Sequence, residues 1–157
     1  MYPYPYKKTF RKTAFRVKKP IRSFRDLEVY QRTNQAATEI MTKVMPLLGE
    51  GSSIIKEKLI DCCLRIPESL ATAHSHRFET GEELKYLEDA LEDCNKAVVY
   101  LEQAPLDACY LTGQARDIFI KDIEGRALCD DLIKRYILIR RKIFNLYRAW
   151  KRFQKVT

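Results

Sequence analysis

The chain has 157 residues, of which 46% are apolar, enough for one domain of ordinary size with a real hydrophobic core. Five glycines, six prolines and 32% charged residues are typical of a helix-rich globular protein, and exclude a fibrous or wholly disordered chain. The net charge is +8, and no stretch approaches the ~20 apolar residues of a membrane span, so we expect a cytoplasmic protein.

Residues 1–22 are predicted to form a basic arm. Pro3, Pro5 and Pro20 oppose a helix, and aromatic side chains alternate with basic ones. The arm lacks the apolar core of a secretory signal, whereas an Arg/Lys-rich transit peptide stays open as an alternative. Its cations are candidate contacts to nucleic acid: Lys7, Lys8, Arg11, Lys12, Arg16, Lys18, Lys19 and Arg22.

Residues 23–157 are predicted to form one helical domain. Ser23 and Asp26 have the spacing of a capping box, which predicts a first helix from Ser23 to about Pro46. A second helix is expected from Ser52 or Ser53 to near Phe78, with Pro67 in its interior. His74, His76 and Arg77 close this helix, either as an ordinary polar end or as phosphate contacts, and Arg77 is the candidate ligand.

A third helix is predicted to open at residues 80–83, to be interrupted by Pro105 and to resume as far as Leu111. Residues 114–124 have a weak helical pattern, and Gly125 is expected to separate them from a last helix at about 127–154. That last helix is two-faced. Its apolar residues recur every three or four positions: Leu132, Tyr136, Ile139, Ile143, Leu146, Trp150 and Phe153. Its cations form an opposite stripe: Lys134, Arg141, Arg148, Arg152 and Lys155.

Charge is divided sharply along the chain. Residues 1–25 carry nine Lys/Arg and no acid, residues 134–157 carry nine more and no acid, and the middle holds all 21 acids. Clustered cations displace condensed counterions from a polyanion, and aromatic rings offer faces on which unpaired bases stack. The division therefore favours RNA as the ligand, with DNA also open. Docking on an acidic protein and binding to a membrane surface are weaker alternatives.

No catalytic motif is recognisable in the sequence. His74 and His76 are two residues apart on a helix and do not converge on one metal, and there is no Glu-x-x-His pair and no phosphate-binding glycine loop. The five cysteines lie in apolar helical patterns, which predicts buried residues in a reducing compartment, although a Cys–His nucleophile is not ruled out by sequence. We expect no enzyme activity, no metal and no cofactor.

Three stretches together resemble a known family. They are FRDLEVYQRTNQAATEI at residues 24–40, IPESLATAHSHRF at 66–78 and LKYLEDALEDCNKAVVYLEQA at 84–104. Their order resembles the bacterial four helix bundle protein family. That family includes the protein encoded in intervening sequences of ribosomal RNA genes, and relatives of the accessory variability determinant (Avd) of diversity-generating retroelements.

The resemblance implies an all-α, antiparallel four-helix bundle that assembles into a homopentamer and has no catalytic function. For the Avd branch it also implies two partners, the retroelement reverse transcriptase and its template RNA. The basic arm and the terminal cationic stripe favour this branch. The ribosomal intervening-sequence branch and a protein-interaction adaptor with basic docking ends are the alternatives.

Overall fold

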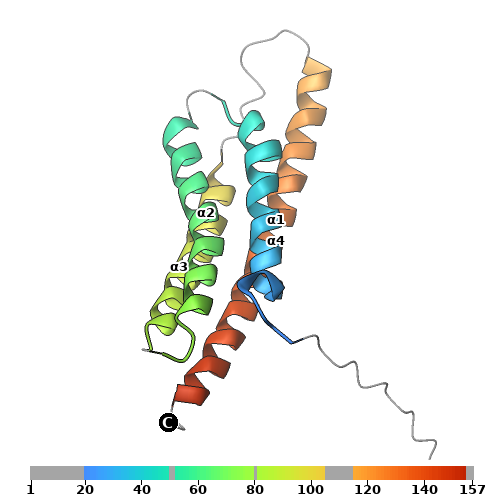
Figure 1. Cartoon of the computed structure of the whole chain (residues 1–157). Coiled ribbons are helices and arrows are strands. Elements are labelled where there is room, and N and C mark those ends of the chain that lie inside the picture. Colours follow the sequence, from blue (N-terminus) through green and yellow to red (C-terminus); the bar gives the residue numbers. More distant parts are fainter. Residues whose placement is uncertain (1–19, 50–51, 80, 105–114, 155–157) are drawn as a thin grey trace, which may run out of the picture.

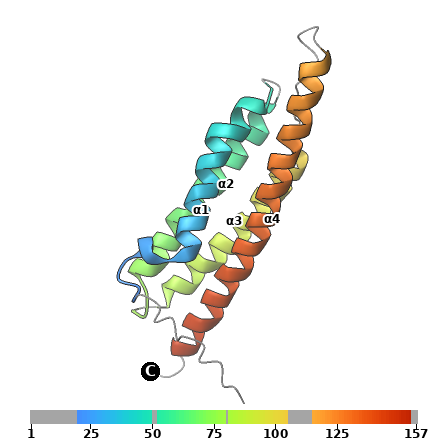
Figure 2. The same cartoon turned by 90° about the vertical axis from the view of Figure 1, so that its right-hand side faces the viewer.

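The computed structural model describes residues 20–49, 52–79, 81–104 and 115–154, and the regular elements in these ranges are all helical. Four helices dominate: α1 (Glu28–Glu39), α2 (Ser53–Ser75), α3 (Glu82–Gln103) and α4 (Ala115–Gln154). Successive helices run in opposite directions (Figure 1 and Figure 2). Each packs on the next, and α1 also contacts α4, which closes the bundle. The predicted all-α, antiparallel four-helix bundle is confirmed.

The first predicted helix is divided into shorter segments. The capping box is confirmed, because Asp26 accepts a hydrogen bond from the backbone N–H of Ser23 at 2.9 Å and Ser23 Oγ accepts one from Arg25. It caps only a short turn, η1 (Phe24–Asp26), since Leu27 is extended with φ −70° and ψ 120°. After α1 the chain widens into a π turn, η2 (Ile40–Val44), and a 3₁₀ turn, η3 (Met45–Leu47), where Pro46 cannot continue the helix.

The expectation that Gly125 separates two helices is wrong. α4 is continuous over 40 residues, about 60 Å at about 1.5 Å per residue. Gly125 is buried within it. A glycine costs an interior helix only about 1 kcal/mol relative to alanine, and packing of the turns that follow it, at Leu128, Cys129 and Leu132, offsets that cost. The interruption predicted at Pro105, and the segment up to Leu111, lie outside the described residues.

The core is formed by one apolar stripe from each helix. α3 contributes Leu87, Ala90, Cys94, Ala97 and Leu101, all fully buried. On α4 the predicted seam is buried from Leu132 to Ile143 and again at Trp150, with Leu146 partly buried. Phe153 is the exception at 64% exposure, because it lies at the last turn, past most of the packed core. Four of the cysteines are buried and unpaired, as predicted, and Cys109 lies outside the described residues.

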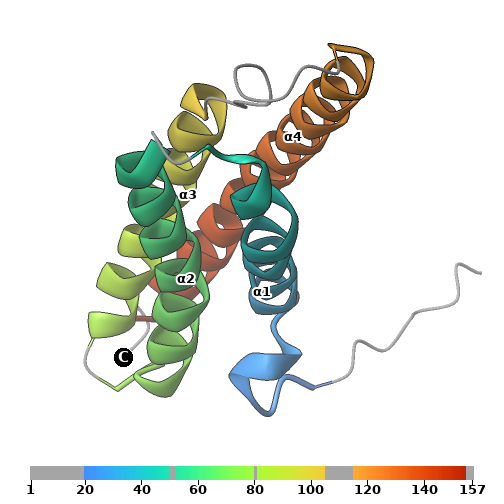
Figure 3. The same ribbon diagram turned by 90° about the horizontal axis from the view of Figure 1, so that it is seen from above.

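An even number of antiparallel helices brings the start of α1 and the end of α4 to the same end of the bundle (Figure 3). The end of α2 and the start of α3 lie there too. Side-chain contacts join these segments, because Gln154 donates to Glu83 and the Phe78 ring meets that of Phe153 at 5.7 Å. The last described residues before both basic chain ends therefore share one end of the molecule.

Candidate nucleic-acid interface

Four cations form an exposed stripe on α4, which we call the ridge: Lys134, Arg141, Arg148 and Arg152. Their spacings of seven and four residues place them on one side of the helix. The predicted fifth member, Lys155, lies outside the described residues. Within the described part of the chain, no ridge residue has an acidic partner within 4.0 Å, so the ridge presents uncompensated positive charge.

Two other cations of α4 are used to hold α1. Arg135 donates to Glu39 at 3.0 Å, and Lys142 donates to Glu28 at 3.1 Å. The hydrogen bond from Arg135 holds the pKa of Glu39 below its ordinary value. The basic residues of α4 thus divide by face, because those toward α1 are neutralised and those on the ridge are not.

Aromatic rings of the same helix lie under two of the exposed cations. The guanidinium of Arg148 lies 6.0 Å from the Phe144 ring, and the ammonium of Lys151 lies 5.4 Å from the Tyr147 ring. The Phe144 and Tyr147 rings are themselves stacked, 6.4 Å apart and 10° from parallel. Cation–π contacts at exposed sites contribute only about 0.5–1 kcal/mol, but they restrict where these charges lie.

Cations from two other segments lie at the end of the bundle where α4 finishes. Arg77 is half-buried, with its guanidinium 5.3 Å from the Phe78 ring. Phe78 in turn meets Trp150 at 6.1 Å, so Arg77 is tied to the last turns of α4. Arg22 is exposed, and its backbone N–H donates to Asp26 beside η1. The remaining predicted arm contacts, Lys7 to Lys19, lie outside the described residues.

The two histidines that close α2 have different surroundings. Burial, with the nearby charge of Arg77, lowers the pKa of His74, which favours its neutral form at pH 7. His76 stacks on Tyr86 at 5.7 Å, with its Nδ1 atom 3.9 Å from Glu82, at the acidic start of α3. Arg77 is the member of this set that is linked through the Phe78 ring to Trp150 of α4.

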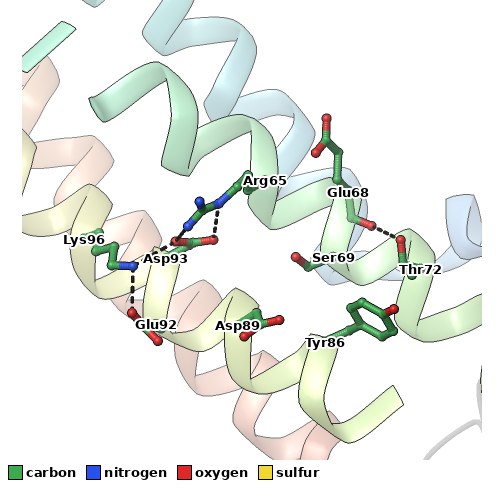
Figure 4. A pocket seen from close by; sticks show the side chains of 9 residues that line it. All are labelled: Arg65, Glu68, Ser69, Thr72, Tyr86, Asp89, Glu92, Asp93 and Lys96. Atoms are coloured by element: carbon green, nitrogen blue, oxygen red, sulfur yellow. Dashed lines mark hydrogen bonds and ion pairs between the residues drawn. The ribbon is translucent and has the colours of Figure 1, made fainter. Parts of the chain in front are cut away.

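An acidic pocket between α2 and α3, with a volume of about 460 Å³, has no counterpart in the sequence prediction (Figure 4). At its base Asp93, 2% exposed, accepts hydrogen bonds from Arg65 Nη2 at 2.7 Å and Nε at 3.1 Å. Lys96 is paired with Glu92 at 2.7 Å, as their spacing suggests. Three further carboxylates line the pocket: Glu68, Asp89 and Glu92. Acidic side chains therefore outnumber the two cations, Arg65 and Lys96, in this pocket, whereas the ridge consists of cations alone.

A buried carboxylate fastens the α2–α3 turn to the end of α4. Glu83 is fully buried, and its Oε1 atom accepts from Gln154 at 2.5 Å and from the backbone N–H of Phe78 at 3.4 Å. The preceding Gly81 has φ +82°, a left-handed conformation that suits glycine. This connection holds the aromatic cluster of Phe78, Trp150 and Phe153 beside Arg77.

Among the described residues, no group of three or more His, Cys, Asp or Glu is arranged to hold a metal ion. Burial raises the pKa of the Cys62, Cys63 and Cys94 thiols to about 12, so they are protonated at neutral pH. No described helix combines the length and apolarity needed to cross a bilayer.

Comparison with known proteins identifies no relative. No family model, curated protein or solved structure matches the chain.

Proposed function

We propose that this protein is a non-catalytic, RNA-binding helical bundle that holds the phosphate backbone along the ridge. The observation that carries the proposal is the contrast on α4. Arg135 and Lys142 are neutralised by α1, while the ridge cations have no acidic partner among the described residues. A row of uncompensated cations along a helix gains free energy by releasing counterions from a polyanion.

The shared end of the bundle supports a role for the arm. The described structure begins at residue 20, shortly before η1, at the end of the bundle where α2 and α4 finish (Figure 1). An arm with seven cations in its first 19 residues then extends the positive surface of the ridge. Contacts of this kind position a strand and carry no base code, so selectivity for RNA comes from its shape and unpaired bases.

The resemblance extends the proposal to an accessory subunit. As an Avd-like protein, the chain would associate with a retroelement reverse transcriptase and its template RNA as a homopentamer. A reverse transcriptase gene beside its own gene is expected for this branch. Location within a ribosomal RNA operon would instead assign it to the intervening-sequence branch.

Salt dependence of binding tests the phosphate contacts. For single strands, log K falls by about 0.7 per log unit of salt for each phosphate contacted, so four ridge contacts give a slope of about −3. Charge reversal of two ridge residues, Arg141→Glu with Arg148→Glu, should flatten the slope by more than about 1. Filter binding across a salt series measures it.

The matched control reverses two exposed lysines away from the ridge, Lys58→Glu on α2 with Lys85→Glu on α3. It makes the same change in net charge, and we expect it to leave the slope close to that of the wild type. Equal effects of the two double variants would reject the ridge as the binding surface. Absence of binding even in dilute buffer would reject nucleic acid altogether and favour docking on an acidic protein.

A further inference from the structure

A second pocket lies between α3 and α4, directly beside the ridge. Its volume is about 340 Å³, at the lower end of the roughly 300–1,000 Å³ that small-ligand sites occupy. Its lining combines apolar and cationic side chains, among them Val98, Tyr136, Ile137, Arg140, Arg141 and Phe144. Arg141 belongs to the ridge as well, so a strand held on the ridge passes the mouth of this pocket.

A polar group in the wall of this pocket has no partner. Tyr136 is 0% exposed, and its hydroxyl has no hydrogen-bond partner among the described residues. Burial raises the pKa of this phenol, so it stays protonated and both donates and accepts hydrogen bonds. A buried hydroxyl without a partner costs free energy, and a ligand that reaches it with a polar edge recovers that cost.

The mouth of the pocket offers a flat apolar surface. Phe144 is 43% exposed and Ile137 is 48% exposed, although both are large apolar residues. The Phe144 ring is held in place by Tyr147 stacked against it and by the Arg148 guanidinium 6.0 Å away. A fixed aromatic ring at an exposed position is a platform on which a planar group stacks.

We propose that this pocket receives one unpaired nucleobase of the bound strand, stacked on Phe144 and hydrogen-bonded at its polar edge by Tyr136. The adjoining phosphate lies against Arg140 and Arg141. The apolar wall suits the face of the base, the Tyr136 hydroxyl its polar edge, and the guanidinium groups of Arg140 and Arg141 the phosphate. This inference rests on the proposed RNA binding and adds that the strand is single at this point, because bases within a duplex are not free to enter.

The test compares strands that differ only in their bases. Fluorescence anisotropy measures the affinity for a short single-stranded RNA and for an abasic strand of equal length and charge. We expect the wild type to prefer the base-bearing strand by about tenfold, in line with stacking of one base. Phe144→Ala should remove most of this preference, and Tyr136→Phe part of it, with the salt dependence unchanged in both variants.

Leu138→Ala is the matched control, because Leu138 is 49% exposed on α4 and does not line the pocket. Photocrosslinking of a thiouridine-containing strand, read by mass spectrometry, should map to Ile137 or Phe144. Equal binding of base-bearing and abasic strands would overturn the pocket proposal and leave the ridge intact, whereas no binding of either strand would overturn both. Displacement of the strand by a peptide of glutamate and phenylalanine from the wild type, but not from Phe144→Ala, would show a protein-docking pocket instead.

Discussion

The Tyr136 hydroxyl has a consequence for the free protein as well. Because its side chain is fully buried and the hydroxyl has no partner among the described residues, it lowers the stability of the native state. We expect Tyr136→Phe to raise the free energy of unfolding by about 1 kcal/mol. Urea denaturation followed by circular dichroism measures it. Tyr147→Phe is the comparison, since that hydroxyl donates to Glu88 at 2.9 Å, and it should have no stabilising effect.

The cysteines give a second prediction about single residues. With thiol pKa values raised to about 12 by burial, Cys62, Cys63 and Cys94 carry almost no thiolate at pH 8. These three should resist alkylation by iodoacetamide in the native protein and react fully in denaturant. Peptide mapping by mass spectrometry reports each site. Rapid native labelling of Cys94 would show that the α3–α4 packing opens readily.

The residues of the ridge were predictable, whereas the partners of buried polar groups were not. Spacings of seven and four residues depend only on helical geometry, so the exposed stripe from Lys134 to Arg152 follows from the sequence. The pairing of Arg65 with Asp93 joins residues 28 positions apart. It depends on how α2 and α3 are aligned along each other, which local pattern does not specify. The position of Tyr136 in the apolar seam was predicted, but the lack of a partner for its hydroxyl was not, because that too depends on the alignment of the helices.

Among the elements, α1 depends on polar contacts with α4. It packs less extensively than α2 or α3, and Glu39 with Arg135 and Glu28 with Lys142 bridge it to α4. Glu39 and Arg135 are 17% and 26% exposed, so their attraction is only partly screened by solvent. Exposed pairs of this kind contribute up to about 1 kcal/mol.

This pair predicts a dependence of stability on pH. A carboxyl whose pKa is lowered on folding stabilises the native state above its unfolded pKa, here 4.5, and that stabilisation is lost as the pH falls through the lowered value. Glu39→Gln should therefore reduce the free energy of unfolding by about 0.5–1 kcal/mol at pH 7. The difference from the wild type should disappear at pH well below 4.5. Urea titrations at the two pH values measure it.

Glu57→Gln serves as the control, because Glu57 is exposed on α2 and has no ion pair among the described residues. It should match the wild type at both pH values. A loss for Glu39→Gln that persists in acid would mean that packing of the side chain, and not its charge, is responsible.

Helix positions were predictable where the apolar period was uninterrupted. α2 and α3 begin directly after Ser52 and Gly81, where the preceding turn residues predict a start, although the Ser52 side chain makes no capping hydrogen bond. The division of the first helix into η1, α1 and η2 was not predictable, since the extended Leu27 and the π turn after Glu39 adjust the helix to its neighbours. At Gly125 the sequence predicted a break that the structure does not have. Glycine weakens an isolated helix, but tertiary packing keeps α4 continuous at this position.

At the scale of the whole molecule, charge is separated by face and by end. The α2–α3 side carries the acidic pocket, and α4 carries the ridge on another face. The antiparallel order places the start of α1 at the end of the bundle where α4 finishes (Figure 3). We propose that Arg22, Arg77 and the ridge, although far apart in the sequence, act together as one positive region.

This arrangement predicts that the arm strengthens RNA binding without contributing to the fold. Deleting residues 1–19 leaves Arg22 in place. Its backbone N–H donates a hydrogen bond to Asp26, so the cap of η1 is retained. Helicity and the melting temperature should stay at wild-type values. The seven lost cations should weaken RNA binding and flatten the salt dependence by as much as about 5 log units per log unit of salt. Circular dichroism and filter binding on the same preparation separate the two effects.

A companion variant distinguishes the charge of the arm from its aromatic rings. Replacing Tyr2, Tyr4 and Tyr6 by serine keeps every arm cation, so it should leave the slope unchanged while lowering affinity for single strands. If the deletion instead lowered the melting temperature while affinity stayed the same, the arm would be a structural part of the bundle. The positive region would then consist of the ridge, Arg77 and Arg22 alone, and the slope of about −3 expected for the ridge would account for most of the binding.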